Sequence, residues 1–225
     1  IISIFSFFVI ILPFITVAIT SFTVNMGKPL TLSNLSLKAW EKVFSRASII
    51  SSTTNSFLTA TAAAFFGILI SCVMAYLLQR TNVKGKRIPD FLITLGSGTP
   101  SVTIALALII SMSGKFGINI YNTLTIMVIA YMIKYMLMGM RTVVSAMSQV
   151  HPSLEEAAQI SGANWLRMLK DVTLPLIAAS IVAGIFLIFM PSFYELTMST
   201  LLYSSNTKTI GYELYIYQTY HSQQV

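Results

Sequence analysis

Long uncharged apolar runs dominate the pattern of hydrophobic and polar positions along this 225-residue chain. Several of them reach the roughly 20 residues that a helix needs to cross a bilayer. We expect five spans, at residues 1–21, 56–78, 91–114, 116–140 and 172–194. A backbone inside a membrane must satisfy its own hydrogen bonds, and runs of this length do so as helices, because barrel strands are shorter and alternate in polarity. The pattern predicts an all-α fold, a polytopic transmembrane helical bundle.

Two of the predicted spans contain helix breakers. The sequence Gly-Ser-Gly-Thr-Pro-Ser at 96–101 interrupts the third span, and Pro191 lies near the end of the fifth. Non-helical backbone at membrane depth is tolerated where protein covers it or where it lines a water-filled cavity. Two interpretations stay open: a packing kink with small residues at a close helix contact, or a part of a transport pathway.

The composition supports a membrane location and excludes several functions. Hydrophobic residues make up 55% of the chain and charged residues only 9%, whereas a soluble domain has about 25% charged residues. A soluble enzyme, a nucleic-acid-binding domain and a disordered chain are therefore poor interpretations. The net charge of +7 does not indicate nucleic acid, because the basic residues are dispersed and form no stripe with aromatic residues. The expected surrounding is the lipid bilayer.

The basic residues predict the orientation of the bundle. The connection 79–90 contains four of them, and the connection 141–171 adds Arg141, Arg167 and Lys170. Short loops rich in Lys and Arg face the cytoplasm, so we expect both connections there. Lys134 lies inside the fourth predicted span, and we expect its long side chain to reach the cytoplasmic interface. His151 and His221 are seventy residues apart without zinc-site spacing, so no metal site is predicted.

The cytoplasmic segment 151–175, which we call the 151–175 loop, has the pattern of two short helices joined by a bend. Ser153 and Glu156 predict a capping box at the start of the first helix. Gly162 is placed to end that helix in a left-handed conformation, Asn164 to cap the second helix, and Pro175 to begin the next span. A partly apolar module of this kind is typical of a contact site, although a helix lying on lipid headgroups is an alternative.

The same loop resembles the EAA loop of permease subunits in binding-protein-dependent ABC importers. That family pattern is E-A-A, three residues, Gly, nine residues, Ile or a similar residue, one residue, then Leu-Pro. The matching residues here are Glu156-Ala157-Ala158, Gly162, Val172 and Leu174-Pro175, with Val for Ile as the one departure. Further similarity extends over most of the chain, at Asn55-Ser56, Ala75-Tyr76 and Glu195-Leu196.

The resemblance implies a fold and a mechanism. The chain would be a single transmembrane domain over 1–225 of the ABC importer permease type (MetI-like), a fragment with a sixth span missing. The short helix of the loop would be a coupling helix that docks on a separate cytoplasmic ATPase subunit, whose closure rocks the spans between inward-facing and outward-facing states. The residues implied in docking are Leu154, Glu156, Ala157, Ala158 and Gly162.

The resemblance also implies the partners of the chain. Beyond the ATP-binding subunit, these are a periplasmic substrate-binding protein and a second permease unit, either an identical copy or a tandem-fused half. The pattern G-x-x-x-x-G-K-[ST] is missing, since Gly85-Lys86-Arg87 fails it on both flanks. We therefore expect no cofactor on this chain, with ATP and Mg held by the partner ATPase. No catalytic residues are predicted, and the expected location is the bacterial inner membrane.

The substrate pathway and the substrate are predicted from less specific features. Thr99, Ser101, Tyr194 and Glu195 are the candidates for lining the pathway or contacting the binding protein. Glu195-Leu196 and Leu201-Leu202-Tyr203 resemble the ferric iron permeases, with phosphonate, thiamine and spermidine permeases as alternatives. A secondary transporter or channel that works without ATP is more remote, because the predicted spans contain no Asp or Glu away from their ends.

Overall fold

A computed structural model describes residues 5, 7–25 and 27–220 of the chain. The described residues are helical apart from turns and two isolated β-bridges, Thr23–Leu35 and Ser113–Asn119. The chain forms two compact units. The first comprises Ile1–Ser52 and Glu213–Val225, and the second comprises Thr53–Tyr212. His221, which the sequence analysis considered, lies outside the described residues.

The first unit contains short helices. The π-helix η1 (Phe7–Ile11) continues into α2 (Leu12–Thr20), and η2 (Leu32–Asn34) and α3 (Lys38–Ser45) follow. Together η1 and α2 form an apolar helical stretch, Phe7–Thr20, that is shorter than the span predicted at 1–21. Residues 1–4 and 6 of that predicted span lie outside the described part of the chain.

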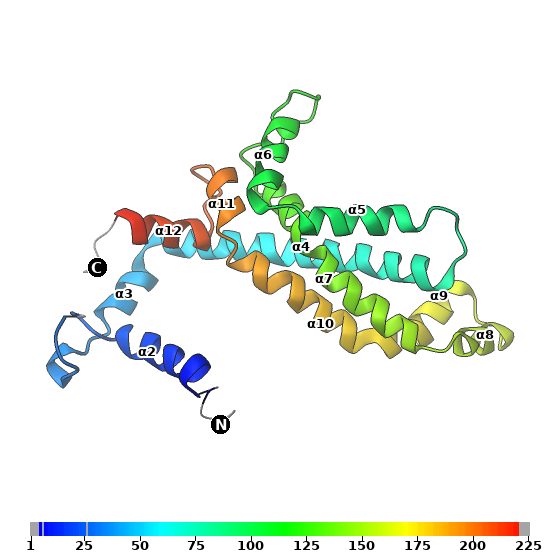
Figure 1. Ribbon diagram of the computed structural model, residues 1–225, viewed down its shortest axis with the longest axis horizontal. Helices are drawn as coiled ribbons and strands as arrows, with labels where there is room; N and C mark the ends of the chain where they lie inside the picture. The colour runs from blue at the N-terminus through cyan, green and yellow to red at the C-terminus, as the bar shows by residue number, and fades with distance from the viewer. Residues whose placement is uncertain (1–4, 6, 26, 221–225) are drawn as a thin grey trace. The chain divides into compact units, whose positions relative to one another are not determined.

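The second unit holds most of the helical bundle (Figure 1). Its helices are α4 (Ala47–Arg80, which begins in the first unit), α5 (Arg87–Gly98), α6 (Ser101–Met112), α7 (Leu124–Gln149), α8 (Pro152–Ile160), α9 (Trp165–Met168), the π-helix η3 (Leu169–Thr173), α10 (Leu174–Phe193), α11 (Thr197–Leu202) and α12 (Ile210–Tyr220, which ends in the first unit). α4, α7 and α10 run side by side, and α8 and α9 lie at one end of them.

Among the described residues, three helical segments are long and apolar enough to cross a membrane: α4, α7 and the continuous stretch Trp165–Phe193. α5 and α6 pass the same test as a pair but are bent by 111° at their break, so the count is four if this pair is one span. The predicted third span is therefore not a straight helix. Thr99 is extended before Pro100, as the residue before a proline usually is, and the helix stops there.

The predicted fourth span is displaced along the chain. α7 begins at Leu124 instead of residue 116 and continues beyond residue 140 to Gln149. A turn precedes it, closed by the Ser113–Asn119 bridge, with Gly114 and Gly117 at positive φ. Two glycines at positive φ favour a turn over a helix, and this explains the late start. The predicted second span is confirmed as part of α4, and the predicted fifth span is confirmed as the end of η3 followed by α10.

Glycines set the close approach of the three long helices. A Cβ added to Gly139 of α7 would lie 2.7 Å from Ile188 Cδ1 of α10. A Cβ on Gly184 of α10 would lie 2.7 Å from Ile68 Cδ1 of α4 and 3.4 Å from Gly139 Cα. Small residues at helix contacts are the usual means of packing membrane helices, because dispersion at short range replaces the hydrophobic driving force.

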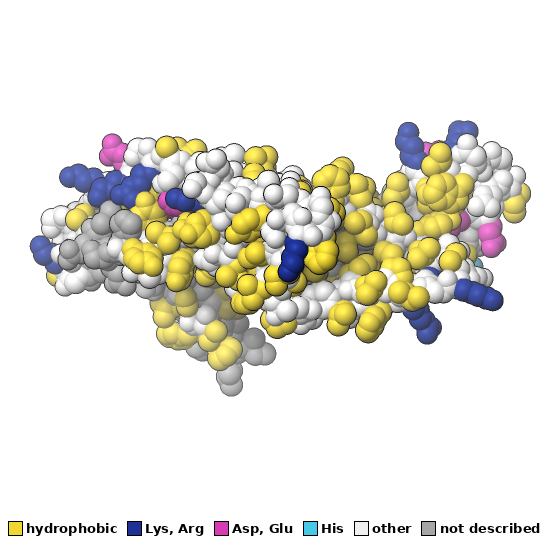
Figure 2. All heavy atoms as spheres, turned by 90° about the horizontal axis from the view of Figure 1, so that it is seen from above, with side chains coloured by type: hydrophobic (Ala, Val, Ile, Leu, Met, Phe, Trp, Pro, Cys, Tyr) yellow, Lys and Arg dark blue, Asp and Glu magenta, His cyan; other side chains and the backbone are white. Residues whose placement is uncertain are grey.

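The outer surface of the second unit is apolar along the helices and charged at one end. Figure 2 shows Lys, Arg, Asp and Glu side chains gathered at the end that carries α8 and α9. Phe65, Phe66 and Val73 of α4 are among many large apolar side chains that stay exposed. An apolar exterior of this extent suits contact with lipid chains or with other apolar helices.

We predict that Gly184→Val destabilises the bundle. The added side chain must displace Ile68 or separate α10 from α7, and overpacking of this kind costs about 1–3 kcal/mol. The free energy of unfolding in mixed detergent micelles measures the change. Gly98→Ala is the matched control, because a Cβ at Gly98 meets no atom within 4 Å, and a change within about 0.5 kcal/mol is expected. Equal stability of both variants would contradict the packing described here.

Candidate functional site

The first helix of the 151–175 loop is capped by a histidine. α8 begins at Pro152, and the side chain of His151 accepts a hydrogen bond from the backbone N–H of Ser153 at 3.2 Å through Nδ1. The predicted capping box of Ser153 and Glu156 is therefore wrong. Proline is favoured at the first position of a helix, since its φ already fits and the missing N–H would be unpaired anyway. The cap consequently lies two residues before Ser153, at His151.

The bend after α8 follows the prediction. Gly162 has φ +90°, and its N–H donates to the carbonyl of Gln159, while the N–H of Ala163 donates to that of Ala158. The side chain of Asn164 accepts a hydrogen bond from the N–H of Arg167 at 2.8 Å and starts α9. Pro175 lies in the first turn of α10. The left-handed glycine and the asparagine cap are both confirmed.

A buried ion pair attaches α8 to the end of α4. Arg80 Nε lies 3.0 Å from Glu155 Oε1, and both side chains are only 8% exposed. Arg80 Nη2 also donates to the carbonyl of Val150, and Thr173 Oγ1 donates to Glu155 Oε1. The pair joins the 79–90 and 141–171 connections, which were both predicted to be cytoplasmic, at the same end of the second unit.

Sequence reasoning missed this role of Glu155. The signal available was the pair of adjacent glutamates on one short helix, because neighbouring helical residues point about 100° apart and only one can face a given partner. Glu156, the residue that matches the family motif, is exposed and has no hydrogen bond or ion pair among the described residues.

The residues predicted to dock the ATPase form an open surface. Leu154 is 47% exposed, and Glu156, Ala157 and Gly162 are exposed as well, whereas Ala158 is partly buried. A Cβ at Gly162 would meet no atom within 4 Å. The chain itself therefore leaves this side of α8 accessible to a partner.

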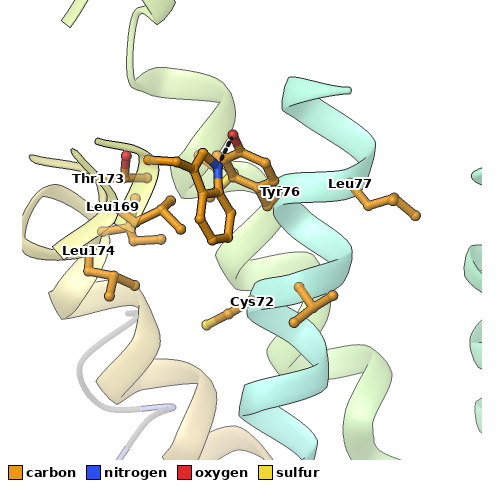
Figure 3. Close-up of a pocket in the computed structure, with 10 residues that line it drawn as sticks. Cys72, Tyr76, Leu77, Leu169, Thr173 and Leu174 are labelled. Atoms are coloured by element: carbon orange, nitrogen blue, oxygen red, sulfur yellow. Dashed lines mark hydrogen bonds between the residues drawn. The ribbon is translucent and has the colours of Figure 1, made fainter. Parts of the chain in front are cut away.

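A second contact attaches α9 to α4. Trp165 Nε1 donates to the hydroxyl of Tyr76 at 2.8 Å, and the two rings meet edge to face with centroids 5.7 Å apart. Below this contact lies an apolar cavity of about 220 Å³ between α4 and the stretch from α9 to α10 (Figure 3). Cys72, Leu169 and Leu174 are among its lining residues.

Lys134 binds the break between α5 and α6. Its Nζ donates to the carbonyls of Ser97 at 3.0 Å and Thr99 at 2.8 Å. The prediction that Lys134 extends to the cytoplasmic interface is therefore wrong. The end of α5 leaves carbonyls without intrahelical partners, and a cation is favoured at a helix C-terminus. Thr99 and Ser101, two of the predicted pathway residues, are both partly buried at this break.

The side chain of Glu195 caps the N-terminus of α11. Its Oε2 accepts hydrogen bonds from the N–H groups of Met198 at 2.7 Å and Ser199 at 3.1 Å. Ser199 Oγ in turn hydrogen-bonds with the hydroxyl of Tyr131. Burial raises the pKa of Glu195, while the backbone hydrogen bonds and the charge of Lys134 oppose this shift. Tyr194, the remaining predicted pathway residue, is 64% exposed.

The described residues contain no group of three or more His, Cys, Asp or Glu side chains that could hold a metal ion. Lys134 and Glu195 act as caps of helix ends, and the exposed side of α8 is an accessible surface.

The apolar helices are those of an integral membrane protein. Residues 67–221 match the family model described as binding-protein-dependent transport system inner membrane component. The match covers more than half of the chain, and the chain belongs to this family of inner-membrane permeases.

Curated relatives carry several substrates in their names. The chain is 27% identical over 203 residues to a putative ferric transport system permease protein, FbpB 1, of Haemophilus influenzae, covering 87% of the chain and 30% of the relative. It is 26% identical over 220 residues to the trehalose/maltose transport system permease protein MalG of Thermococcus litoralis (94% and 77%). It is 28% identical over 173 residues to the sulfate transport system permease protein CysT of Salmonella typhimurium (73% and 62%). The chain spans about a third of the length of the two ferric permeases of Haemophilus influenzae that it matches.

A solved structure confirms the all-α fold. The chain resembles a chain of a bacterial ABC transporter involved in the import of the acidic polysaccharide alginate, with a TM-score of 0.74 and 17% sequence identity. The likeness covers 98% of this chain and 82% of the other. At this identity it shows the fold alone.

We predict that Lys134→Met destabilises the α5–α6 break. The carbonyls of Ser97 and Thr99 lose their donor, and a lost hydrogen bond to a charged group costs about 1.5–3 kcal/mol. The unfolding midpoint in mixed micelles is the measurement. Lys115→Met is the matched control, because Lys115 is exposed and has no hydrogen bond or ion pair among the described residues. A midpoint lowered equally by both substitutions would show that Lys134 contributes no specific contact.

Proposed function

We propose that this chain is a permease domain of an ATP-binding-cassette importer, and that its 151–175 loop docks on a separate cytoplasmic ATPase subunit. The observation that carries the proposal is the exposed side of α8, which combines Leu154, Glu156 and Ala157 beside the left-handed turn at Gly162. α8 lies at one end of the long helices of the second unit (Figure 1).

The chemistry of that surface suits a protein partner. Leu154 offers an exposed apolar side chain, Ala157 allows close approach of a partner's backbone, and Glu156 offers an unpaired carboxylate to a basic group. Buried apolar anchors with a charged rim are typical of protein interfaces. Ala158 adds a small side chain beside this surface, and Gly162 ends α8 in a left-handed turn.

ATP and Mg belong, in this proposal, to the partner. The glycine-lysine pair at 85–86 forms a turn in which Lys86 Nζ donates to the carbonyls of Leu78 and Thr81. A lysine that caps the end of α4 is unsuited to bind a phosphate in the manner of a P-loop lysine. The chain is therefore proposed to bind no cofactor and to act as the non-enzymatic transport subunit.

The translocation pathway is proposed to form between this domain and a second permease unit. The exposed apolar faces of α4 and α10 are available to such a unit, either an identical copy or the other half of a tandem fusion. The pathway candidates are Thr99, Ser101, Tyr194 and Glu195, and Lys134 holds the carbonyl of Thr99.

Ferric iron, delivered by a periplasmic binding protein, is the proposed substrate. Its support is the set of ferric permeases among the relatives. A structural relative is an alginate importer in complex with a periplasmic protein, which supports a partner of that type. Phosphonate, thiamine and spermidine remain the alternatives from the sequence, and the relatives add sulfate and sugars.

We predict that Gly162→Val abolishes capture of the ATPase subunit. Valine at φ +90° is strongly strained, so the turn after α8 must change and the docking surface is displaced. Co-purification of the ATPase with the full-length permease in mild detergent is the measurement. Gly162→Asn is the control, because asparagine tolerates the left-handed region and should retain capture. A valine variant that captures the ATPase as wild type does would contradict the proposed docking site.

We predict that the binding protein purified with this importer binds ferric iron. The permease pathway follows the selectivity of the external receptor, so the receptor's ligand identifies the substrate. Titration of that protein with Fe³⁺, sulfate, a phosphonate, thiamine, spermidine and maltose, followed by calorimetry, is the measurement. Saturable binding of another compound without Fe³⁺ binding would replace iron as the substrate and leave the permease assignment intact.

A further inference from the structure

Both helices of the 151–175 loop are attached to one face of α4. Tyr76 and Arg80 are four residues apart on α4, and side chains at this spacing lie one above the other on a helix. Arg80 binds Glu155 of α8, and Tyr76 binds Trp165 of α9. We call these two contacts the clasp.

The ionic contact of the clasp resists separation. Arg80 and Glu155 are nearly inaccessible to water, and each has a further hydrogen bond, to the Val150 carbonyl and from Thr173 respectively. Pulling such a pair apart leaves two charges without partners in a poorly solvated site, and breaking a buried pair is strongly unfavourable for that reason. The clasp therefore holds the 151–175 loop to α4 more firmly than surface contacts would.

An apolar cavity lies beside the contact between α9 and α4. The cavity of about 220 Å³ separates Cys72 and Leu77 of α4 from Leu169 and Leu174 of the following stretch (Figure 3). The Trp165–Tyr76 hydrogen bond bridges the two sides at its rim. The polar contacts of the clasp therefore add to the burial of Met168 of α9 and to the continuous helical stretch Trp165–Phe193 in fixing the position of the loop.

The opposite end of α4 is also attached to a distant segment. Asn55 Nδ2 donates to the carbonyls of Asn206 at 3.2 Å and Lys208 at 2.9 Å, and Ser56 Oγ accepts from the N–H of Ile210 at 2.9 Å. Between Asn55 and Arg80 the helix extends roughly 37 Å at 1.5 Å per residue. One continuous helix thus joins the 151–175 loop to residues 206–210.

We propose that α4 and the 151–175 loop move as one rigid body, and that α4 transmits displacement of the loop to residues 206–210 at its far end. The positioning residues of this rigid body are the four residues of the clasp, Arg80, Glu155, Tyr76 and Trp165. The inference rests on the proposed function, in which a docked ATPase displaces the loop. It adds that the clasp, separately from docking, converts ATP hydrolysis into movement of the spans.

The first test compares docking with coupling in the assembled importer. Arg80→Met/Glu155→Met removes both charges together, which avoids an unpaired buried charge, and Tyr76→Phe removes only a hydroxyl. We expect both variants to capture the ATPase, while transport per ATP hydrolysed falls on the order of tenfold in the double variant, within the range of allosteric coupling factors. Tyr76→Phe should show a smaller fall in the same direction.

Arg167→Met is the matched control of that test. It breaks the Arg167–Asp171 ion pair, whose side chains are 74% and 54% exposed within the same loop and which does not reach α4. We expect wild-type capture and a wild-type transport ratio. Clasp variants with the wild-type ratio would overturn the proposal. A wild-type permease that never captures an ATPase would instead contradict the proposed function.

The second test measures the rigid body directly. Spin labels at Ile160→Cys on α8 and Leu69→Cys on α4, in a Cys72→Ser background, report the distance between loop and helix, since both positions are exposed. We expect one distance in the nucleotide-free and ATP-bound importer, and a broadened distribution when Arg80→Met/Glu155→Met is added. A distance that changes between the two states with the clasp intact would overturn the proposal.

Discussion

The arrangement of the 151–175 loop depends on the buried ion pair between Arg80 and Glu155. Burying two charges is costly, and the cost is offset only where the geometry is good and the remaining donors and acceptors are paired. Here Val150 and Thr173 supply those further bonds. The pair therefore determines which side of α8 faces the bundle, and by exclusion which side remains open to a partner.

A second constraint explains several other charged residues. The ends of a helix leave backbone groups without partners inside the helix, and side chains of the same chain can pair them. Lys86 binds two carbonyls at the end of α4, Lys134 binds two at the end of α5, and Glu195 binds two N–H groups at the start of α11. Cations lie at C-termini and the anion at an N-terminus, as the helix dipole favours. Only 9% of the residues are charged, and several of these pair the free backbone groups at helix ends.

Local signals made much of this structure predictable. The all-α fold, the helices α4 and α10, the left-handed Gly162 and the Asn164 cap all follow from apolar length or from short-range backbone rules. The positions of Lys134 and Glu155 do not, because they depend on contacts between segments 37 and 75 residues apart in sequence. Hydropathy likewise found the apolar run at 91–114 but could not give the 111° bend, which arises from one extended residue before Pro100.

The adjacent glutamates of α8 divide two tasks that one residue could not perform. Neighbouring positions on a helix point about 100° apart, so Glu155 reaches Arg80 only by turning Glu156 towards solvent. A carboxylate that anchored the loop would be unavailable to a partner, and one that faced a partner would leave Arg80 buried without a counter-charge. The pair resolves this conflict within one helical turn. It follows that the two glutamates should affect different properties. Glu155 should affect the attachment of the loop to α4, and Glu156 should affect the contact with the partner subunit.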